Sequence, residues 1–379
     1  MSTTVDTARV LVADDQSDVR TALGMLMRDA GLESDSADNV DEVRRKLASG
    51  SYDLLLLDLN YARDTTSGWE GLELLAEVHA RDPLLPVVVM TGWGSIEMAV
   101  EAMRRGARSF VHKPWDNARL SDAIRREVAE GRAARHAERR ALREQAEAQA
   151  MQRALLPASL PAVPHGSLAA RWLPASAFGG DCYDVLQLDA THFAISVADV
   201  CGKGLAAALL MSNLQASVRA FAASDSTPVS IAASVNAALV RNGGPRRFVT
   251  FFYAVYDSTT RELTFANAGH NPPMLVSADG AVRRLAAGGM VLGVFEATTV
   301  EQQSVQLQPG DRLVLFTDGI VEAENAADEE FGDARLLDIV VERRSAAAGT
   351  LVDDIFAGVA HFAGGPLRDD ATVVVLAVR

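Results

Sequence analysis

Short apolar runs alternate with stretches of helical length in the first third of the chain. The continuous apolar runs are RVLVA (9–13), YDLLLL (52–57), PVVVM (86–90) and RSFV (108–111), with a weaker strand near 33–37. Such runs are typical of strands covered on both faces of a parallel sheet. Helical patterns lie between them, at 17–30, 39–48, 69–80 and 95–105. The pattern therefore predicts a doubly wound α/β domain around a five-stranded parallel sheet.

One long helix is predicted from Leu120 to Leu156. This segment has no proline and a single glycine, Gly131, and it is rich in Ala, Arg, Glu and Gln. The residues spaced three and four apart along one side of this helix are mostly alanine and include Glu144. Such a side would form only a weak coiled coil. Pro157 ends the helix and marks a domain boundary. We therefore expect a first domain at 8–122, a helical linker at 123–156 and a second domain at 157–379.

The second domain has a different pattern, with alternating strands and interspersed helices. The predicted strands are 190–200, 249–257, 262–268, 311–318 and 371–378. The predicted helices are 204–222, 227–241, 334–345 and 349–363. This combination favours an α+β sandwich of the α-β-β-α type, with two sheets inside and helices outside.

Composition and charge restrict the kind of protein. Apolar residues make up 49% of the 379 residues and the formal charge is −14, so packed domains are expected and nucleic-acid binding is not. The start, MSTTVDT, lacks the features of a targeting segment, and no apolar run approaches the ~18 residues that a membrane span needs. We expect a cytoplasmic location without membrane attachment. Two cysteines, Cys182 and Cys201, are too few for a disulfide framework or a thiolate metal site.

Acidic residues stand at the ends of the apolar strands of the first domain. Asp14 and Asp15 follow the first strand and Asp58 follows the third, and these ends meet at one edge of a parallel sheet. Three crowded carboxylates are costly without a hard cation such as Mg²⁺. Thr91 and Lys113 add a hydroxyl and an ammonium group at the same edge. A single aspartate at a strand end is usually a turn or cap residue. The five residues together indicate a site that accepts a phosphoryl group on one aspartate.

With these residues, the segment 8–125 resembles the response-regulator receiver family. The resemblance implies that Asp58 is the phosphoacceptor, that Asp14, Asp15 and Asp58 hold Mg²⁺, and that a histidine kinase or a small phosphodonor supplies the phosphoryl group. It also implies switch roles for Thr91, Lys113 and the aromatic Phe110, and a Lys113–Pro114 bond that is cis. The segment from Asn60 to Trp69 is a longer loop than the shortest receivers have.

Four aspartate motifs recur in the second domain, in glycine-containing turns or at strand ends. They are GGDCYD (179–184), ADVCGKG (198–204), FTDGIVEA (316–323) and RDDATVVV (368–375), with NAGHNPPML (267–275) between the second and third. Each motif alone is common turn chemistry. Together they predict carboxylates and backbone carbonyls around two metal ions, which activate a water for hydrolysis.

This ordered set, beginning with QRALLPASLP (152–161), resembles the SpoIIE-like branch of the metal-dependent (PPM-type) Ser/Thr protein phosphatases over roughly 150–379. By resemblance, Asp181 organises a metal or its water, Asp199 bridges both metals and the Val200 carbonyl joins the first. Asp318 and Asp369 would hold the second. The resemblance also implies two Mn²⁺ or Mg²⁺ ions, and a phosphorylated anti-sigma-factor antagonist (STAS-type) protein as the substrate.

Two weaker signals lie in the second domain. The GKG at 202–204 lacks the frame of a nucleotide P-loop, which favours a structural or electrostatic role for Lys203. His270 lies in a Gly/Asn/Pro segment that is typical of a hydrogen-bonded turn, with catalysis by a general acid as the alternative. Cys182 and Cys201 flank metal aspartates and are expected to be buried, inert thiols.

The parts together predict a two-component response regulator whose output is hydrolysis of phosphoserine or phosphothreonine, controlled at Asp58, with a linker that could form a homodimer. Two alternatives stay open. The second domain could be a non-catalytic switch that binds a partner according to phosphorylation, or a phosphatase of small molecules.

Overall fold

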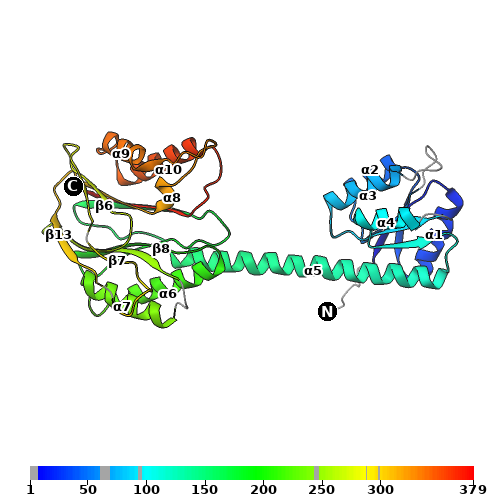
Figure 1. The fold of residues 1–379 in the computed structure, drawn as a ribbon, viewed down its shortest axis with the longest axis horizontal. Helices are drawn as coiled ribbons and strands as arrows, with labels where there is room; N and C mark the ends of the chain where they lie inside the picture. Colours follow the sequence, from blue (N-terminus) through cyan, green and yellow to red (C-terminus); the bar gives the residue numbers. More distant parts are fainter. Residues whose placement is uncertain (1–6, 60–68, 93–95, 243–246, 287, 298) are drawn as a thin grey trace. The chain divides into compact units, whose positions relative to one another are not determined.

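The computed structural model describes residues 7–59, 69–92, 96–242, 247–286, 288–297 and 299–379. The chain divides into two compact units, Met1–Glu144 and Gln145–Arg379 (Figure 1). The predicted loop from Asn60 to Trp69 lies outside the described residues, apart from Trp69, which begins a helix.

The first unit contains the predicted five-stranded parallel sheet, in the order β2-β1-β3-β4-β5. Its strands are β1 (Arg9–Ala13), β2 (Glu33–Ala37), β3 (Leu54–Asp58), β4 (Val87–Thr91) and β5 (Ser109–His112). Its first four helices are α1 (Ser17–Asp29), α2 (Val40–Ser49), α3 (Trp69–Arg81) and α4 (Ile96–Arg104). The doubly wound α/β fold is confirmed.

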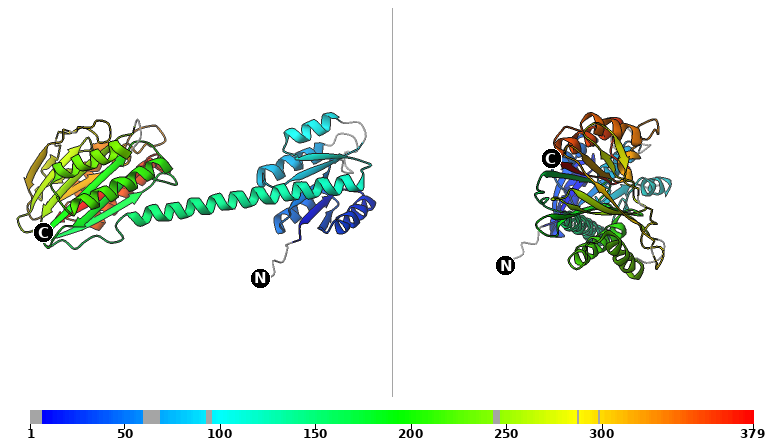
Figure 2. Two further views of the ribbon diagram at one scale, coloured as in Figure 1. Left: turned by 90° about the horizontal axis from the view of Figure 1, so that it is seen from below. Right: turned by 90° about the vertical axis from the view of Figure 1, so that its left-hand side faces the viewer.

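Each face of this sheet has its own apolar core, because β1, β3 and β4 carry apolar residues at consecutive positions. Val43, Leu75 and Ala102 bring α2, α3 and α4 against one face. Leu23 of α1 and Ile124 of α5 pack on the other face (Figure 2). Covering both faces leaves the carboxyl ends of the strands as the open edge for chemistry.

Helix α5 (Asn117–Leu155) is one helix of 39 residues and begins three positions before the predicted start at Leu120. Its first part belongs to the receiver-like unit, and its last eleven residues, from Gln145, belong to the second unit. Residues 136–147 are all exposed. That stretch contributes no residue to an apolar core, so it depends on the helix propensity of its Ala, Arg, Glu and Gln residues and on the Arg140–Glu144 ion pair.

The second unit contains two five-stranded sheets. One has the order β13-β10-β9-β8-β7 and the other β12-β11-β14-β15-β6. The strands are β6 (Gly166–Leu173), β7 (Cys182–Gln187), β8 (His192–Val200), β9 (Val249–Asp257), β10 (Glu262–Ala268), β11 (Met274–Val276), β12 (Val282–Arg284), β13 (Gln302–Gln306), β14 (Arg312–Phe316) and β15 (Ala371–Val378). Phe193, Phe252, Phe265 and Leu315 lie in the apolar layer between the sheets.

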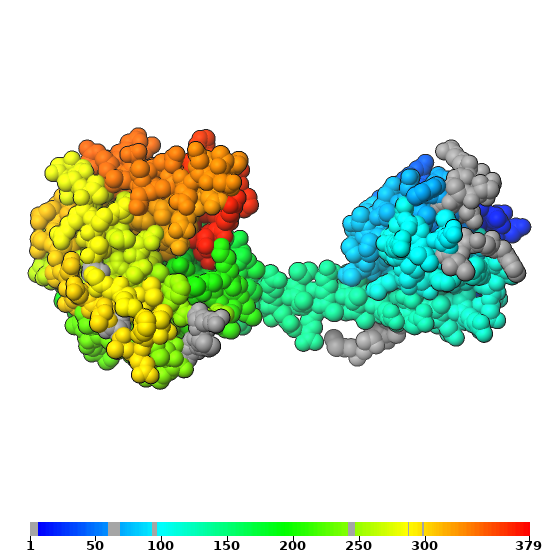
Figure 3. Space-filling model, in the orientation of Figure 1, coloured from blue at the N-terminus to red at the C-terminus, as the bar shows by residue number. Residues whose placement is uncertain are grey.

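Helices cover the outer face of both sheets. They are α6 (Leu205–Ala222), α7 (Pro228–Asn242), α8 (Asp318–Val321), α9 (Gly332–Glu342) and α10 (Ala348–Ala363). Met211 and Val235 pack α6 and α7 on the sheet of β8 and β9. Leu336 and Ile355 pack α9 and α10 on the sheet of β14 and β15. The two helices form part of the surface of the second unit (Figure 3, orange). The α-β-β-α sandwich is confirmed.

The structure differs from the predicted elements of the sandwich, because the strands β6, β7, β11, β12 and β13 were not predicted. The strand predicted to reach Asp318 ends at Phe316, and Asp318 begins the short helix α8. Among the described helices, α6 alone is long and apolar enough to cross a membrane by length and composition. Its apolar side contributes Leu214 and Val218 to the core against β8 and β9, which accounts for its composition.

Candidate functional sites

The acidic side chains at the sheet edge of the first unit gather as the topology requires. Each of Asp14, Asp15 and Asp58 offers a carboxylate oxygen within 4.8 Å of the others. Asp14 and Asp58 are buried, with 0% and 2% of their surface exposed. The backbone N–H of Gln16 donates to Asp14 Oδ1 at 2.9 Å, which fixes that carboxylate at the start of α1.

Lys113 joins the two buried carboxylates. Its Nζ donates to Asp14 Oδ2 and to Asp58 Oδ2, both at 2.7 Å. Burial alone would lower the pKa of Lys113, but the bonds to Asp14 and Asp58 raise it overall, so the ammonium group stays charged. The Lys113–Pro114 peptide bond is cis. Phe110 on β5 is 46% exposed and makes an edge contact with the His112 ring.

Two buried oxygen atoms at this sheet edge are available to bind a cation and a phosphoryl group. Asp15 Oδ1 and Thr91 Oγ1 have no hydrogen-bond partner among the described residues. Buried oxygen atoms without partners are costly unless a ligand satisfies them. Carboxylate oxygens suit Mg²⁺, and the Thr91 hydroxyl lies on β4, next to the strand that carries Asp58.

Asp181 is the most deeply buried member of the second acidic cluster, in the α-β-β-α sandwich. It is 1% exposed, and its Oδ2 accepts bonds from Thr317 Oγ1 at 2.7 Å and Thr372 Oγ1 at 2.6 Å. The two threonines come from neighbouring strand ends, where Thr372 N also donates to Thr317 Oγ1. Both bonds go to Oδ2, so they fix the orientation of the Asp181 carboxylate and leave Oδ1 without a bond from these threonines.

The aspartates of this cluster influence one another's protonation. Burial and the Asp199 carboxylate raise the pKa of Asp181 well above its usual range. Burial, with the carboxylates of Asp318 and Asp369, raises the pKa of Asp199 to about 7. Burial and Asp369 also raise the pKa of Asp318. Carboxylates that repel each other in a buried cluster are a donor set for divalent cations, which relieve the repulsion.

This second cluster is broader than the first. In the described part of the chain, the only three-member group with oxygen atoms within 4.8 Å of one another is the receiver-like one. A wider set of four aspartates is compatible with two ions that share a bridging ligand.

The glycines beside the aspartates permit close backbone contacts. A Cβ on Gly180 would lie 2.8 Å from the Val200 carbonyl oxygen, so only glycine lets the Asp181 turn approach the predicted carbonyl ligand. A Cβ on Gly319 would lie 2.0 Å from the Asp370 carbonyl oxygen. These contacts bring the GGD, DV, DG and DD motifs together.

Two charged residues support the cluster from its margin. Lys203 Nζ lies 3.0 Å from Asp369 Oδ2 and donates to the Arg368 carbonyl at 2.6 Å, which agrees with the electrostatic role expected for it. Asp370 accepts bonds from Gly180 N at 2.6 Å and Ala175 N at 2.8 Å. Asp370 therefore holds the turn that carries Asp181.

The last turns of α5 contact the same turn. Gln152 is buried, its Nε2 donates to the Gly179 carbonyl at 2.6 Å, and Gly179 N donates to its Oε1 at 3.2 Å. The Leu155 carbonyl accepts bonds from Gln215 Nε2 and Arg219 Nη2 of α6. Helix α5 thus touches the turn before Asp181 and the helix that follows Asp199.

His270 forms a hydrogen-bonded turn. Its N–H donates to Asn267 Oδ1, and Asn267 Nδ2 donates to the His270 carbonyl. Burial lowers the pKa of His270 to about 4, which favours the neutral ring near pH 7. The predicted hydrogen-bonded turn is present, and catalysis by a general acid stays the alternative. Cys182 is buried as expected, and burial raises the pKa of its thiol. Cys201 is only partly buried, so the prediction of a buried thiol was wrong at that position.

Thr317, Thr372, Asp370 and Gln152 are parts of the site that sequence reasoning missed. Thr317 and Asp370 are adjacent to predicted ligands in the FTDG and RDDAT motifs, and that adjacency was the available signal. Gln152 opens the QRALLPASLP segment, but nothing in the local pattern shows that it reaches a glycine 27 residues away.

Comparisons with known proteins agree with both parts of the chain. The model of the response regulator receiver domain matches residues 10–125, and the model of stage II sporulation protein E (SpoIIE) matches residues 189–379. The phosphoserine phosphatase RsbU of Bacillus subtilis is 31% identical over 212 residues, which cover 55% of this chain and 62% of RsbU. Protein IcfG of Synechocystis is 28% identical over 250 residues, which cover 58% of this chain and 39% of IcfG.

The fold of the second unit also has a solved counterpart. The SiaA-PP2C domain of Pseudomonas aeruginosa superposes with a TM-score of 0.57 at 23% identity, over 64% of this chain and 99% of that domain. The chain spans less than two thirds of the length of RsbU and of IcfG. Because the SpoIIE model covers half of the chain and a receiver model covers most of the rest, the chain belongs to the SpoIIE family and carries a response-regulator receiver domain at its N-terminal end.

Proposed function

We propose that this protein is a response regulator whose output is the metal-dependent hydrolysis of phosphoserine or phosphothreonine on a regulatory protein. The observation that carries the proposal is the cluster of Asp181, Asp199, Asp318 and Asp369, in which burial and the neighbouring carboxylates raise the pKa of the first three. The likeness to the phosphoserine phosphatase RsbU supports the choice of substrate class.

We assign Asp181, Asp199, Asp318, Asp369 and the Val200 carbonyl to two Mn²⁺ or Mg²⁺ ions. When bound, the two ions supply a nucleophilic water near neutral pH and neutralise the charge of the phosphoryl group. Thr317 and Thr372 orient the Asp181 carboxylate, and Lys203 balances negative charge at Asp369. The protein thus contributes fixed ligand geometry and a partly desolvated site.

The receiver supplies the control input. A phosphodonor transfers its phosphoryl group to an Asp58 carboxylate oxygen, and the donor keeps the electron pair of the broken bond. Lys113 and the Thr91 hydroxyl lie at the same sheet edge as Asp58, where they would contact the new phosphoryl oxygens. Asp14, Asp15 and Asp58 form the proposed Mg²⁺ site.

Helix α5 is the candidate route for coupling the two domains. Its first part packs in the receiver core. Near its end, Gln152 forms a hydrogen bond with the turn before Asp181, and the Leu155 carbonyl accepts one from α6. A helix that packs in both domains can bias both equilibria, which coupling requires.

The expected partners are a cognate histidine kinase, a phosphorylated anti-sigma-factor antagonist of the STAS type and a second copy of this chain along the exposed part of α5. A cytoplasmic location accords with these partners.

One turnover assay separates the proposal from its alternatives. Full-length protein with Mn²⁺ is expected to release phosphate from a phosphoserine protein over many turnovers. A partner-binding switch would bind that protein without release of phosphate. A small-molecule phosphatase would act on a metabolite and leave the phosphoprotein intact.

The natural substrate can be found by comparing phosphoproteins in cells that carry the wild type or Asp318→Asn. Proteins whose phosphoserine accumulates only in the variant are candidate substrates. Asp353→Asn provides the control, because Asp353 is 75% exposed on α10 and the same chemical change there leaves the metal ligands intact.

A further inference from the structure

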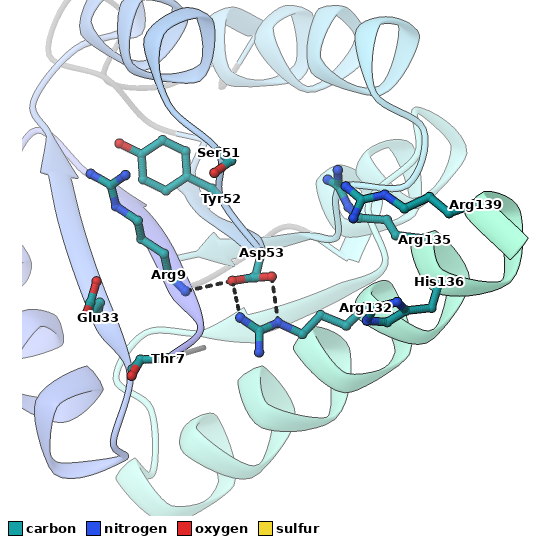
Figure 4. A pocket seen from close by; sticks show the side chains of 10 residues that line it. All are labelled: Thr7, Arg9, Glu33, Ser51, Tyr52, Asp53, Arg132, Arg135, His136 and Arg139. Carbon is teal, nitrogen blue, oxygen red and sulfur yellow. Dashed lines mark hydrogen bonds and ion pairs between the residues drawn. The ribbon is translucent and has the colours of Figure 1, made fainter. Parts of the chain in front are cut away.

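A basic hollow lies at the sheet edge opposite Asp58. It is about 530 Å³ in volume and is bounded by the amino ends of β1, β2 and β3 on one side and by α5 on the other (Figure 4). Arg9, Glu33 and Asp53 line it from the sheet, and Arg132, Arg135, His136 and Arg139 line it from the helix. A volume of this size suits a small ligand.

The helical residues of the hollow share one face of α5. Arg132, Arg135, His136 and Arg139 follow the spacing i, i+3, i+4 and i+7, which places their side chains over one another. All four lie beyond residue 125, where the receiver match ends. The hollow is thus made by the extension of α5 and is not a feature of the matched receiver segment.

Three arginines of the lining are held in place by carboxylates. Arg9 Nη2 lies 2.5 Å from Asp35 Oδ2. Arg132 Nε and Nη2 donate to the two oxygens of Asp53 at 2.7 and 2.8 Å. Burial alone would raise the pKa of Asp53, but the bonds from Arg132 and the Arg9 backbone lower it overall, so this pair is ionised. Arg135 Nη2 lies 2.6 Å from Asp82 Oδ2. These pairs fix the donors before any ligand arrives.

The lining of the hollow has four arginines against Glu33 and Asp53. Two further carboxylates that are not part of the lining, Asp35 and Asp82, pair with Arg9 and Arg135. Arg139 and His136 make no hydrogen bond or ion pair with another described residue, and both extend from α5 among the residues that line the hollow (Figure 4). The uncompensated donors therefore gather on the helical side.

We propose that this hollow binds a small polyphosphate anion, such as a pyrophosphate or triphosphate group. Guanidinium groups present rigid forks of donors that match phosphate oxygens, and several forks around one hollow suit linked phosphates better than a single carboxylate. Because the lining comes from both the sheet and α5, the bound anion fastens residues 132–139 of the helix to the receiver. The ligand would be a second input to the helix that reaches the phosphatase domain.

Calorimetric titration of the full-length protein tests the proposal. Pyrophosphate, tripolyphosphate and ATP are titrated separately in EDTA, which keeps divalent ions out of both acidic clusters. We expect one saturable site, and the ATP arm distinguishes a nucleotide from an inorganic anion as the ligand. Arg139→Ala should weaken binding about tenfold, the usual cost of one charged hydrogen-bonding group.

Two further variants make the test specific. Glu33→Gln removes a negative charge from the lining and should strengthen binding severalfold, a gain that misfolding cannot produce. Arg140→Ala should leave affinity unchanged, because Arg140 pairs with Glu144 and does not line the hollow. Absence of binding by the wild type, an unchanged affinity of Arg139→Ala, or an equal loss in Arg140→Ala would overturn the proposal.

Discussion

Gln152 and Gly179 are joined by two hydrogen bonds, one in each direction between the amide side chain and the peptide backbone. Gln152 belongs to the last turns of the linker helix, and Gly179 is two residues before Asp181. A residue outside the catalytic motifs thus positions the turn that carries a proposed metal ligand.

Gln152→Ala should therefore reduce turnover. The variant leaves a buried N–H and a buried carbonyl of Gly179 unpaired, a cost of about 1–3 kcal/mol, so we expect about a tenfold fall in kcat and a higher Mn²⁺ concentration for half-maximal activity. Steady-state kinetics across a Mn²⁺ series measure both. Arg153→Ala, at an exposed position one residue later, is the matched control. An unchanged Mn²⁺ requirement would show that Gln152 does not position the ligand turn.

Asp58→Asn should abolish phosphate uptake from acetyl phosphate in the presence of Mg²⁺, because an amide cannot form an acyl phosphate. Mass spectrometry of the intact protein detects the added phosphoryl group. Asp41→Asn, which alters an exposed acid on α2, should be labelled as the wild type is. Labelling of Asp58→Asn at the wild-type level would reject the assignment.

Asp199→Asn and Asp318→Asn should each lose most turnover. Replacing a charged ligand by a neutral amide weakens metal affinity and makes the activated water less acidic. Chelation should stop the wild type, and added Mn²⁺ should restore it. Phosphate release by these proteins and by the Asp353→Asn control gives the comparison, and full activity in EDTA would exclude a metal-dependent reaction.

The stability of the chelated protein should fall as pH rises from about 4 to 7. The pKa of Asp199 is about 7 in the fold and near 3.8 in the unfolded chain, so in this window the folded state binds the additional proton. The resulting decrease in the free energy of unfolding is on the order of a few kcal/mol. Urea unfolding at several pH values measures it, and Asp199→Asn should flatten the slope.

Saturating Mn²⁺ should reverse that dependence, because metal binding requires ionised carboxylates and becomes weaker as pH falls. If the chelated and the metal-loaded proteins show the same slope, the cluster does not bind the ion.

Two prolines inserted near Ala141 should uncouple the domains. They break the helix in its exposed part and leave both sites intact. We expect phosphate uptake at Asp58 and hydrolysis to continue, while the hydrolysis rate no longer depends on phosphorylation of Asp58. Seven inserted alanines keep the helix and nearly restore its phase, so that control should stay coupled. Unchanged regulation in the proline variant would mean that the linker is a passive tether.

The sequence predicts mainly those strands whose side chains are buried, because burial requires runs of apolar residues. β1, β3, β4, β8, β9 and β15 carry apolar runs and were found. All four edge strands of the sandwich, β6, β7, β12 and β13, were missed. The interior strand β11 was missed as well, because three residues are too few to show a strand pattern. An edge strand such as β13, with the sequence QQSVQ, is held mainly by backbone hydrogen bonds to its neighbour, and these leave little trace in the pattern of apolar residues.

The same distinction applies to the site. Asp181 and Asp318 were recognised because their glycine neighbours form motifs. The hydroxyl groups that hold Asp181 come from 136 and 191 residues away in the chain, so only the fold brings them there.

The exposed residues 136–147 of α5 make the coupling sensitive to temperature. A helical segment without tertiary packing is only marginally stable in water, and its helix–coil equilibrium shifts toward coil on warming. In the single chain this middle segment would melt at temperatures where both domains are still folded. Heat would then disconnect the phosphorylation signal from the phosphatase without inactivating either one.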